Sequence, residues 1–409
     1  MATSPPPSQD KPCPAIPMGV DETIQHSDWP ALTQAEIKAV LASHGHAHHR
    51  QPRILETSIR PYSAAALVTL PHGEELFIKR HDGRLRTAGA QQKEHDFIHH
   101  LHSQGLPVIQ PLKTPQGQSF ISLPSQQGAP QIYELFPGLK GRDTYRHDVT
   151  WGQSWHNQAQ AYAAGALLGR LHRASATWRT PPQPRSQEAL LLSGMAPLEG
   201  ADGANRFLAA MAQRGLPEQR ALLAGDLPGL LHHFHQRLRQ APSQEVFLWG
   251  HGDWHGVNLT WRQDDADKIE EVFDFGMSDA TSAAFDLAVA LERSAIAWLN
   301  PGGPAPFSQA LLDAFLAGYA STGFSAALKR CASWLPLCHV PFALSEDDYY
   351  RRLLQDGASA DIALEGYLVG HMQWFLAEEG QRFLSTLQQS AERHAAAARH
   401  CPLTPSQKR

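Results

Sequence analysis

The pattern of apolar and polar residues divides the chain near Pro137-Gly138. Before this point, short runs rich in apolar and β-branched residues alternate with turn residues, which is typical of antiparallel strands. Two stretches differ: residues 87–102 repeat apolar positions at helical spacing, and residues 33–43 begin with a threonine cap followed three positions later by glutamate. The predicted strands of this half are residues 53–60, 64–70, 75–80, 106–109, 119–123 and 131–136.

Beyond residue 138 the periodicity is mostly helical. The predicted helices are residues 156–174, 227–239, 283–298, 308–321, 328–335, 346–355 and 362–396. Residues 188–240 hold several shorter helices. The two halves together predict an α+β protein, with a small antiparallel β lobe that contains one main helix and a large, mostly helical lobe.

Strands return only in residues 245–276. This stretch begins with an apolar run at residues 246–249, which a loop at residues 250–257 follows. Two predicted strands come next, at residues 258–262 and 268–273, with a polar turn between them. If the two strands pair as a hairpin, Asn258 lies beside Asp274, and Asp253 stands on the loop that leads in. Two carboxylates and an amide oxygen at one point form a hard, oxygen-rich site, which suits magnesium better than zinc.

Composition narrows the class of protein. The chain has 409 residues, 42% hydrophobic and 18% charged, which is typical of a globular protein with a sizeable core. A net charge of −5 gives no reason to expect a nucleic-acid or membrane partner, and no apolar run is long enough to span a bilayer. The four cysteines form no CxxC pair, so we expect a reducing, cytoplasmic location. Residues 1–28 are polar and rich in proline, which predicts a disordered tail.

The motif HGDWHGVN at residues 251–258, followed by DFG at residues 274–276, resembles the aminoglycoside phosphotransferase and choline kinase-like family. FDLA at residues 285–288 and the Gly318-Tyr319 pair also match that family, and the resemblance covers roughly residues 50 to 320. The five-residue spacing between Asp and Asn is also that of the protein kinase catalytic loop. The resemblance therefore implies a bilobal protein kinase-like fold and an ATP-dependent kinase.

The resemblance also implies roles for the residues of the motif. Asp253 matches the catalytic Asp that accepts a hydrogen bond from the acceptor hydroxyl, and His255 matches a residue that organises the catalytic loop. Asn258 and Asp274 match the ligands of Mg²⁺. A zinc site built from His251 and His255 is disfavoured, because glycines follow both histidines and argue against a helix there.

In the small lobe, Lys79 and Glu94 resemble the lysine that binds the ATP phosphates and the helix glutamate that pairs with it. The loop between the first two strands holds no glycine, so the phosphate-binding loop is not assigned, and Ser63 with nearby N–H groups is the candidate. Residues 133–138 stand where the family has its interlobe hinge, which would bring backbone groups of Glu134 and Phe136 to the adenine.

Other polar residues have structural interpretations. Asp286 lies in an apolar helix and needs a partner, so we expect it to support the catalytic loop. His172 is interpreted as a core histidine. Histidines gather at residues 44–49, 99–102 and 232–235 without a trusted metal-ligand spacing, which favours solvated surfaces.

We therefore predict an ATP- and Mg²⁺-dependent phosphotransferase that acts on a hydroxyl of a small molecule, such as an amino alcohol, a hydroxy amino acid, a sugar or an aminoglycoside. A cationic acceptor would need acidic groups in the large lobe, with Glu199, Asp202 and Glu292 as candidates. The alternatives are a Ser/Thr protein kinase-like member, a catalytically silent nucleotide-binding protein of the same fold, and a hydrolase with a two-metal site. The predicted units are a tail, a small lobe, a hinge and a catalytic lobe, at residues 1–28, 29–132, 133–138 and 139–409.

Overall fold

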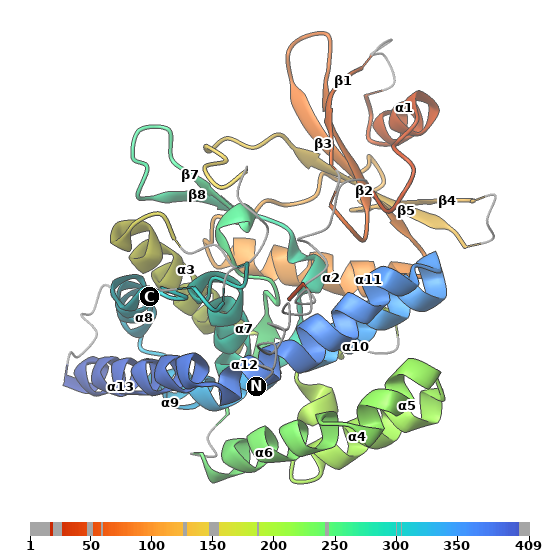
Figure 1. The fold of residues 1–409 in the computed structure, drawn as a ribbon. Coiled ribbons are helices and arrows are strands. Elements are labelled where there is room, and N and C mark those ends of the chain that lie inside the picture. The colour runs from red at the N-terminus through yellow and green to blue at the C-terminus, as the bar shows by residue number, and fades with distance from the viewer. Residues whose placement is uncertain are drawn as a thin grey trace, which may run out of the picture.

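A β-rich lobe stands above a larger helical lobe in this computed structural model (Figure 1). The structure describes residues 17–18, 27–46, 52–58, 60–125, 129–146, 155–185, 188–241, 245–299, 301–303 and 305–400. Most of the predicted tail lies outside these residues. Within them, no helix is both long and apolar enough to cross a membrane.

The small lobe is built on one antiparallel sheet with the strand order β1-β2-β3-β5-β4. Its strands are β1 (Arg53–Thr57), β2 (Ala64–Thr69), β3 (Glu75–Asp82), β4 (Ile121–Leu123) and β5 (Gln131–Pro137). Five of the six predicted strands are confirmed. The strand predicted at residues 106–109 was wrong: this segment forms only an isolated bridge, from Val108 to Val272. Pro107 has no N–H to donate to a ladder, which explains the interruption.

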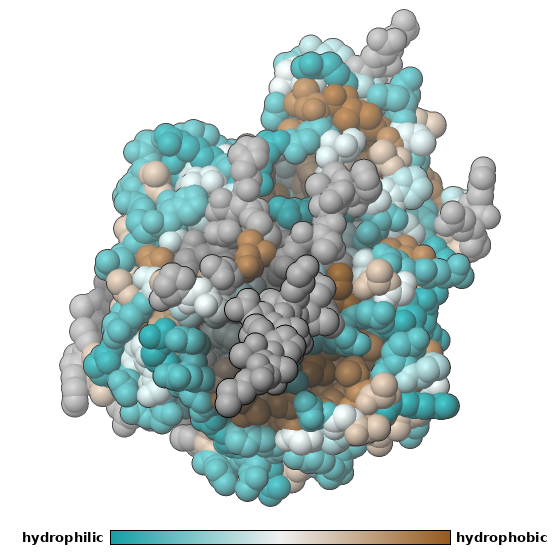
Figure 2. Space-filling model, in the orientation of Figure 1, coloured by the Kyte–Doolittle hydropathy of each residue, from teal (hydrophilic) through white to brown (hydrophobic). Residues whose placement is uncertain are grey.

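Helix α1 (Gln34–Ser43) covers one face of this sheet. The predicted cap is confirmed, because the Thr33 hydroxyl accepts from the Glu36 N–H at 3.2 Å and the Glu36 carboxylate accepts from the Thr33 N–H at 2.7 Å. Ile37 and Val40 are buried against the apolar face of the strands. Figure 2 shows further apolar residues gathered over the strands of this lobe.

Helix α2 (Ala88–Ser103) begins at the Thr87 cap and packs below the sheet. Its apolar face belongs to the core of the large lobe, because Phe97 contacts the rings of Trp178 and Phe275 with ring centroids 5.8 Å apart. The helix thus connects the sheet of the small lobe to the helical lobe.

The helical lobe is organised around α3 (Gln158–Ala176) and α8 (Gln309–Ala320), which approach closely through glycine. A Cβ at Gly318 would lie 2.0 Å from the Tyr162 carbonyl oxygen, so only glycine permits this spacing. The remaining helices of the middle region are α4 (Gly203–Arg214), α5 (Pro217–Ala224), α6 (Leu227–Gln240), α7 (Ala283–Ala295) and α9 (Ser325–Trp334).

The strands of this lobe are β6 (Phe247–Gly250), β7 (Leu259–Trp261), β8 (Ile269–Val272) and β9 (Asp279–Ser282). The predicted hairpin is confirmed, with Leu259 opposite Val272. Asn258 ends a short 3-10 turn that precedes β7, one residue before the strand begins. Strand β9, which pairs antiparallel with β6, was not predicted, because its sequence DATS has no large apolar residue.

The C-terminal helices differ most from expectation. Helix α10 (Val340–Asp348) begins before the predicted start at residue 346 and continues as a π-helical stretch, Tyr349–Leu354. The single helix predicted over residues 362–396 is interrupted after Leu376, because Ala377 is extended with φ −68° and ψ 164°. The pieces are α11 (Gly357–Asp361), a second π-helical stretch (Ile362–Gly370), α12 (His371–Leu376) and α13 (Glu378–His400).

Candidate active site

A cavity of about 1020 Å³ opens between the two lobes. Residues of β2, β3 and β5 line it from above, and residues of the loops after β6 and β8 line it from below. The structure brings together here all nine site residues predicted from the sequence: Ser63, Lys79, Glu94, Glu134, Phe136, Asp253, His255, Asn258 and Asp274.

The loop that follows β6 is held by Asp286, from the first turn of α7. Its carboxylate accepts hydrogen bonds from the N–H groups of His251 at 2.9 Å and Gly252 at 2.8 Å. The buried His172 imidazole lies 2.9 Å from the same carboxylate, so the expected support of the loop and the core position of His172 are both confirmed. Gly252 has φ +77° and no room for a Cβ, because the Met277 carbonyl would lie 2.1 Å away.

Three side chains of this loop contact one another. The Asn258 amide nitrogen donates to the Asp253 carbonyl at 2.8 Å and lies 3.2 Å from its Oδ2. His255 Nε2 lies 3.3 Å from the same Oδ2. Because the amide nitrogen of Asn258 is directed into the loop, its oxygen is the atom that could ligate a cation.

The Asp253 carboxylate lies beside His255 and Arg293. Burial by itself would raise its pKa, but His255 and Arg293 outweigh this effect and hold the pKa well below its ordinary value. Arg293 comes from α7, and its Nε lies 3.4 Å from Asp253 Oδ1. Sequence reasoning missed Arg293, although its position seven residues after Asp286 places both on one face of the helix.

Asp274 stands at the start of the DFG segment in a left-handed conformation, with φ 57°. Such a conformation is uncommon for a residue other than glycine and is found at functional sites. Its Oδ1 accepts from Lys79 Nζ at 2.8 Å, and this ammonium group lowers the pKa of Asp274 against the opposing effect of burial. The ion pair joins β3 of the small lobe to the DFG segment of the large lobe.

The expected pairing of Lys79 with Glu94 is wrong in this structure. Glu94 Oε2 instead accepts from Arg86 at 2.7 Å and from Arg185 at 3.3 Å. Each of these arginines also donates through Nη2 to the Gly276 carbonyl at 2.8 Å. The two buried guanidinium groups therefore connect α2 to the DFG segment. Lys79 contacts Asp274 instead of Glu94. No local pattern indicates this arrangement, because the loop that carries Arg185 reaches α2 only in the folded chain.

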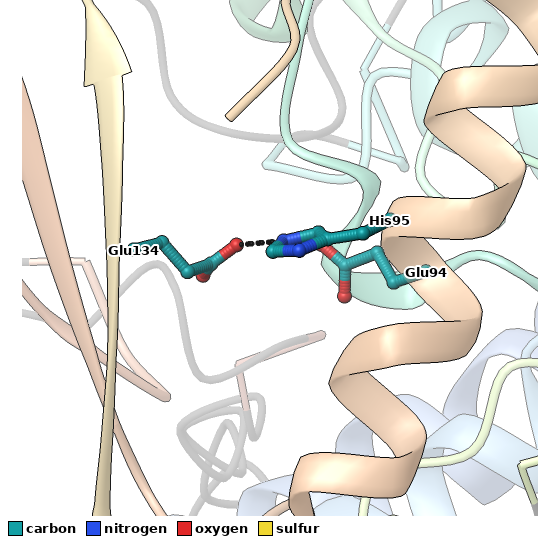
Figure 3. A group of neighbouring side chains, drawn as sticks. All are labelled: Glu94, His95 and Glu134. Carbon is teal, nitrogen blue, oxygen red and sulfur yellow. Dashed lines mark hydrogen bonds and ion pairs between the residues drawn. The ribbon is translucent and has the colours of Figure 1, made fainter. Parts of the chain in front are cut away.

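The inner wall of the cavity is a buried network centred on Glu134 of β5 (Figure 3). The Glu134 carboxylate lies 2.6 Å from His81 Nε2 and 2.7 Å from His95 Nε2, and it accepts from Gln91 at 2.9 Å. Glu94, His95 and Glu134 are close enough to surround a cation. Their ligand atoms are already engaged by imidazole, amide and guanidinium groups, so we assign this network a structural role.

The predicted hinge requires a second correction. Most of residues 133–138 belong to β5, and the Leu135 carbonyl accepts from the Leu112 N–H at 2.7 Å on the side away from β3. Backbone groups alternate along a strand, so those of Glu134 and Phe136 point toward β3 and not to a ligand. Glu134 and Phe136 therefore line the cavity with their side chains.

Comparison with known proteins shows the family of this chain. The model of the phosphotransferase enzyme family matches residues 62–332, which is more than half of the chain. The chain belongs to this family. It is accordingly a kinase, a phosphotransferase with an alcohol group as acceptor. No curated protein matches the chain by sequence.

Solved structures resemble this phosphotransferase in fold. An amicoumacin kinase in complex with AMP-PNP, Ca²⁺ and its ligand is 17% identical, with 87% of this chain and 90% of that chain covered at a TM-score of 0.50. An aminoglycoside phosphotransferase from Alicyclobacillus acidocaldarius is 14% identical, with coverages of 89% and 98% and a TM-score of 0.52. The GDP complex of an aminoglycoside 2′-phosphotransferase is 11% identical, with coverages of 82% and 97% and a TM-score of 0.52. These similarities confirm the bilobal kinase-like fold.

Proposed function

We propose that this phosphotransferase transfers the γ-phosphoryl group of ATP to a hydroxyl of a small molecule. The observation that carries the proposal is the meeting of Asp253, Asn258, Asp274 and Lys79 at one interlobe cavity. Phosphoryl transfer depends mainly on positioning and charge neutralisation, and these four residues supply both. The amicoumacin kinase complex, which holds AMP-PNP and Ca²⁺, supports the use of a nucleotide and a divalent cation.

Asp253 acts as the base in this proposal. Its depressed pKa keeps the carboxylate ionised at neutral pH, so it accepts a hydrogen bond from the acceptor hydroxyl and takes the proton late in the reaction. His255 and Asn258 contact the same carboxylate and fix its orientation.

The donor set at the DFG segment fits a hard divalent cation, because Asn258 offers an amide oxygen and Asp274 a carboxylate. Bound Mg²⁺ would supply neutralisation of the charge that develops on the phosphate oxygens. Lys79 now holds Asp274, and we propose that the ammonium group turns to the nucleotide phosphates when ATP enters. Glu94 does not orient Lys79 but couples α2 to the DFG segment through Arg86 and Arg185.

The nucleotide base would lie beneath the sheet, where Ala65, Leu67 and Phe77 give the cavity an apolar roof. Backbone groups at the end of β5 and just after it, around Pro137 and Leu139, then take the place predicted for Glu134 and Phe136. In this arrangement residues 29–132 cover the nucleotide, and residues 139–409 supply the catalytic groups and the acceptor site.

The substitution Asp253→Asn tests the proposal. It removes the base and keeps the size of the side chain, so we expect phosphoryl transfer to fall by about 10²- to 10⁴-fold. Binding of ATP, measured by calorimetry, should persist, and chelation of divalent cations should stop transfer by the wild-type protein. Transfer is measured as acceptor-dependent ADP release over amino alcohols, hydroxy acids, sugars and aminoglycosides.

Asp264→Asn is the matched control, because Asp264 is an exposed carboxylate in the turn between β7 and β8. This variant should retain wild-type transfer. Full activity of Asp253→Asn would contradict the assigned base. Binding of ATP without turnover of any acceptor by the wild-type protein would favour the catalytically silent alternative.

A further inference from the structure

The half of the cavity beside Asp253 has a distinct lining, contributed by both lobes. Its walls come from the β1–β2 loop, from α7, from α10 and from the second π-helical stretch, through Tyr62, Arg293, Phe342, Glu346 and Tyr367. If Asp253 is the base, as proposed above, this is where the acceptor binds, so the inference drawn here rests on the proposed function.

Arg293 lies beside the proposed base, in the half of the cavity where the acceptor would bind. Its guanidinium carbon lies 5.2 Å from the centroid of the Phe342 ring and 5.9 Å from that of Tyr367, while its Nε lies 3.4 Å from Asp253 Oδ1. Two aromatic faces and a carboxylate would ordinarily suit a cationic ligand. Here the protein's own guanidinium already covers those faces.

The carboxyl groups near Arg293 do not make this half of the cavity a binding site for a cationic acceptor. Glu346 is buried, and its Oε1 accepts from the Tyr62 hydroxyl at 2.5 Å. Glu292 lies outside the cavity lining, and its Oε2 faces Arg293 Nε at 3.6 Å; burial raises the pKa of Glu292 in spite of this neighbour. The two other acidic residues predicted to bind a cationic acceptor, Glu199 and Asp202, are exposed and do not line the cavity.

We propose that Arg293 selects acceptors that carry a carboxylate close to the reacting hydroxyl, which makes hydroxy acids the substrate class. A hydroxyl that donates to Asp253 brings the atoms next to it within reach of the guanidinium. A carboxylate there gains a charge-assisted hydrogen bond from a planar donor. An ammonium group in the same place meets a like charge and finds both aromatic faces covered.

A three-carbon series with one skeleton isolates the charge: 3-hydroxypropanoate, 1,3-propanediol and 3-amino-1-propanol. With ATP and Mg²⁺, we expect kcat/KM of the wild-type protein to be at least about tenfold higher for the acid than for the amino alcohol, with the diol between them. Arg293→Gln should lower kcat/KM for the acid by about 10- to 100-fold, as expected for loss of a hydrogen bond to a charged group. The same substitution should change kcat/KM for the amino alcohol far less.

Glu346→Gln serves as the opposing variant, because Glu346 is the carboxylate that a cationic acceptor would need. The order of preference by charge should survive this substitution. The inference is overturned if the wild-type protein has a higher kcat/KM for the amino alcohol than for the acid. It is also overturned if Arg293→Gln lowers kcat/KM for all three acceptors equally, or if Glu346→Gln abolishes a preference for the amino alcohol.

Binding of the three compounds in the presence of ADP and Mg²⁺, followed by thermal shift, keeps this test separate from the proposed reaction. Stronger stabilisation by the acid than by the amino alcohol, lost in Arg293→Gln, supports the inference even without transfer. Unaltered phosphoryl transfer by Asp253→Asn would instead contradict the proposed function, and it would not affect the charge preference measured by binding.

Discussion

At the scale of single residues, charge compensation governs the site. Asp253 and Asp274 are each placed beside a cation, Arg293 and Lys79 respectively, and both have a lowered pKa in spite of burial. Both carboxylates therefore stay ionised near neutral pH. This state suits a base and a cation ligand, the roles we propose for them.

The buried His81 gives a pH prediction at this scale. Burial, together with Arg86 and Lys79, lowers the pKa of His81 to about 4. A histidine of ordinary pKa, near 6.5, in the unfolded chain then binds more protons than the folded protein does between about pH 6.5 and pH 4. The contribution of His81 to stability is therefore fully present above about pH 6.5 and declines as the pH falls toward 4.

The measurement is thermal unfolding of the wild-type protein and of His81→Gln across this pH range. Glutamine keeps a donor for Glu134 but does not titrate. The wild-type protein should lose stability more steeply than the variant on acidification, by no more than about 3 kcal/mol at pH 4. Parallel pH profiles would show that His81 does not titrate in this way.

At the scale of elements, the contact between α3 and α8 depends on glycine in both helices. A Cβ at Gly165 would lie 2.0 Å from the Phe315 carbonyl oxygen, and one at Gly318 would lie equally close to that of Tyr162. Helix α3 carries His172, which contacts Asp286 of α7, so this packing also bears on the loop after β6 that Asp286 holds.

Gly318→Ala should destabilise the protein by about 1–3 kcal/mol, because overpacking against a backbone atom outweighs the better helix propensity of alanine. Gly229→Ala in α6 is the matched control, since no heavy atom lies within 4 Å of its added Cβ. That variant should be neutral or more stable by up to about 1 kcal/mol. Denaturant unfolding compares the two, and equal stability of both variants would argue against the close contact.

Sequence reasoning located most elements and missed some of their ends and partners. The capping box of α1 and the β7–β8 hairpin were predicted because their signals are local. Strand β9 carries no apolar alternation and exists because β6 lies beside it. The break after Leu376 was also missed, and Gly380 permits it, since a Cβ there would lie 2.1 Å from the Trp374 carbonyl oxygen.

At the scale of the whole molecule, side-chain contacts connect the lobes across the cavity. Lys79 of β3 binds Asp274, and Tyr62 of the β1–β2 loop donates to Glu346 of α10. Tyr62 adopts φ 72°, a conformation that is rare for a tyrosine and that the interlobe contact must stabilise. The lobes are thus held over the site by side chains that also line it.

This arrangement predicts coupled stabilisation by nucleotide and metal. A non-hydrolysable ATP analogue with Mg²⁺ at about 100 times its Kd should stabilise the wild-type protein by about 2.7 kcal/mol, seen as a rise in Tm. Asp274→Asn should lose the Mg²⁺-dependent part of the rise, and Asp264→Asn should keep it. An undiminished Mg²⁺ effect in Asp274→Asn would remove Asp274 from the proposed metal site.

By itself, the sequence determined the motif residues and the α+β lobes, because periodicity, caps and a loop of fixed spacing are encoded within a few neighbouring positions. The resemblance of those motifs to a known family then implied the kinase-like fold. Only the tertiary structure decided the partners of those residues. Glu94 meets Arg86 and Arg185 instead of Lys79, and Arg293 comes to lie beside Asp253. Charged side chains have long reach, and their pairing depends on which segments fold against each other, which no local pattern records.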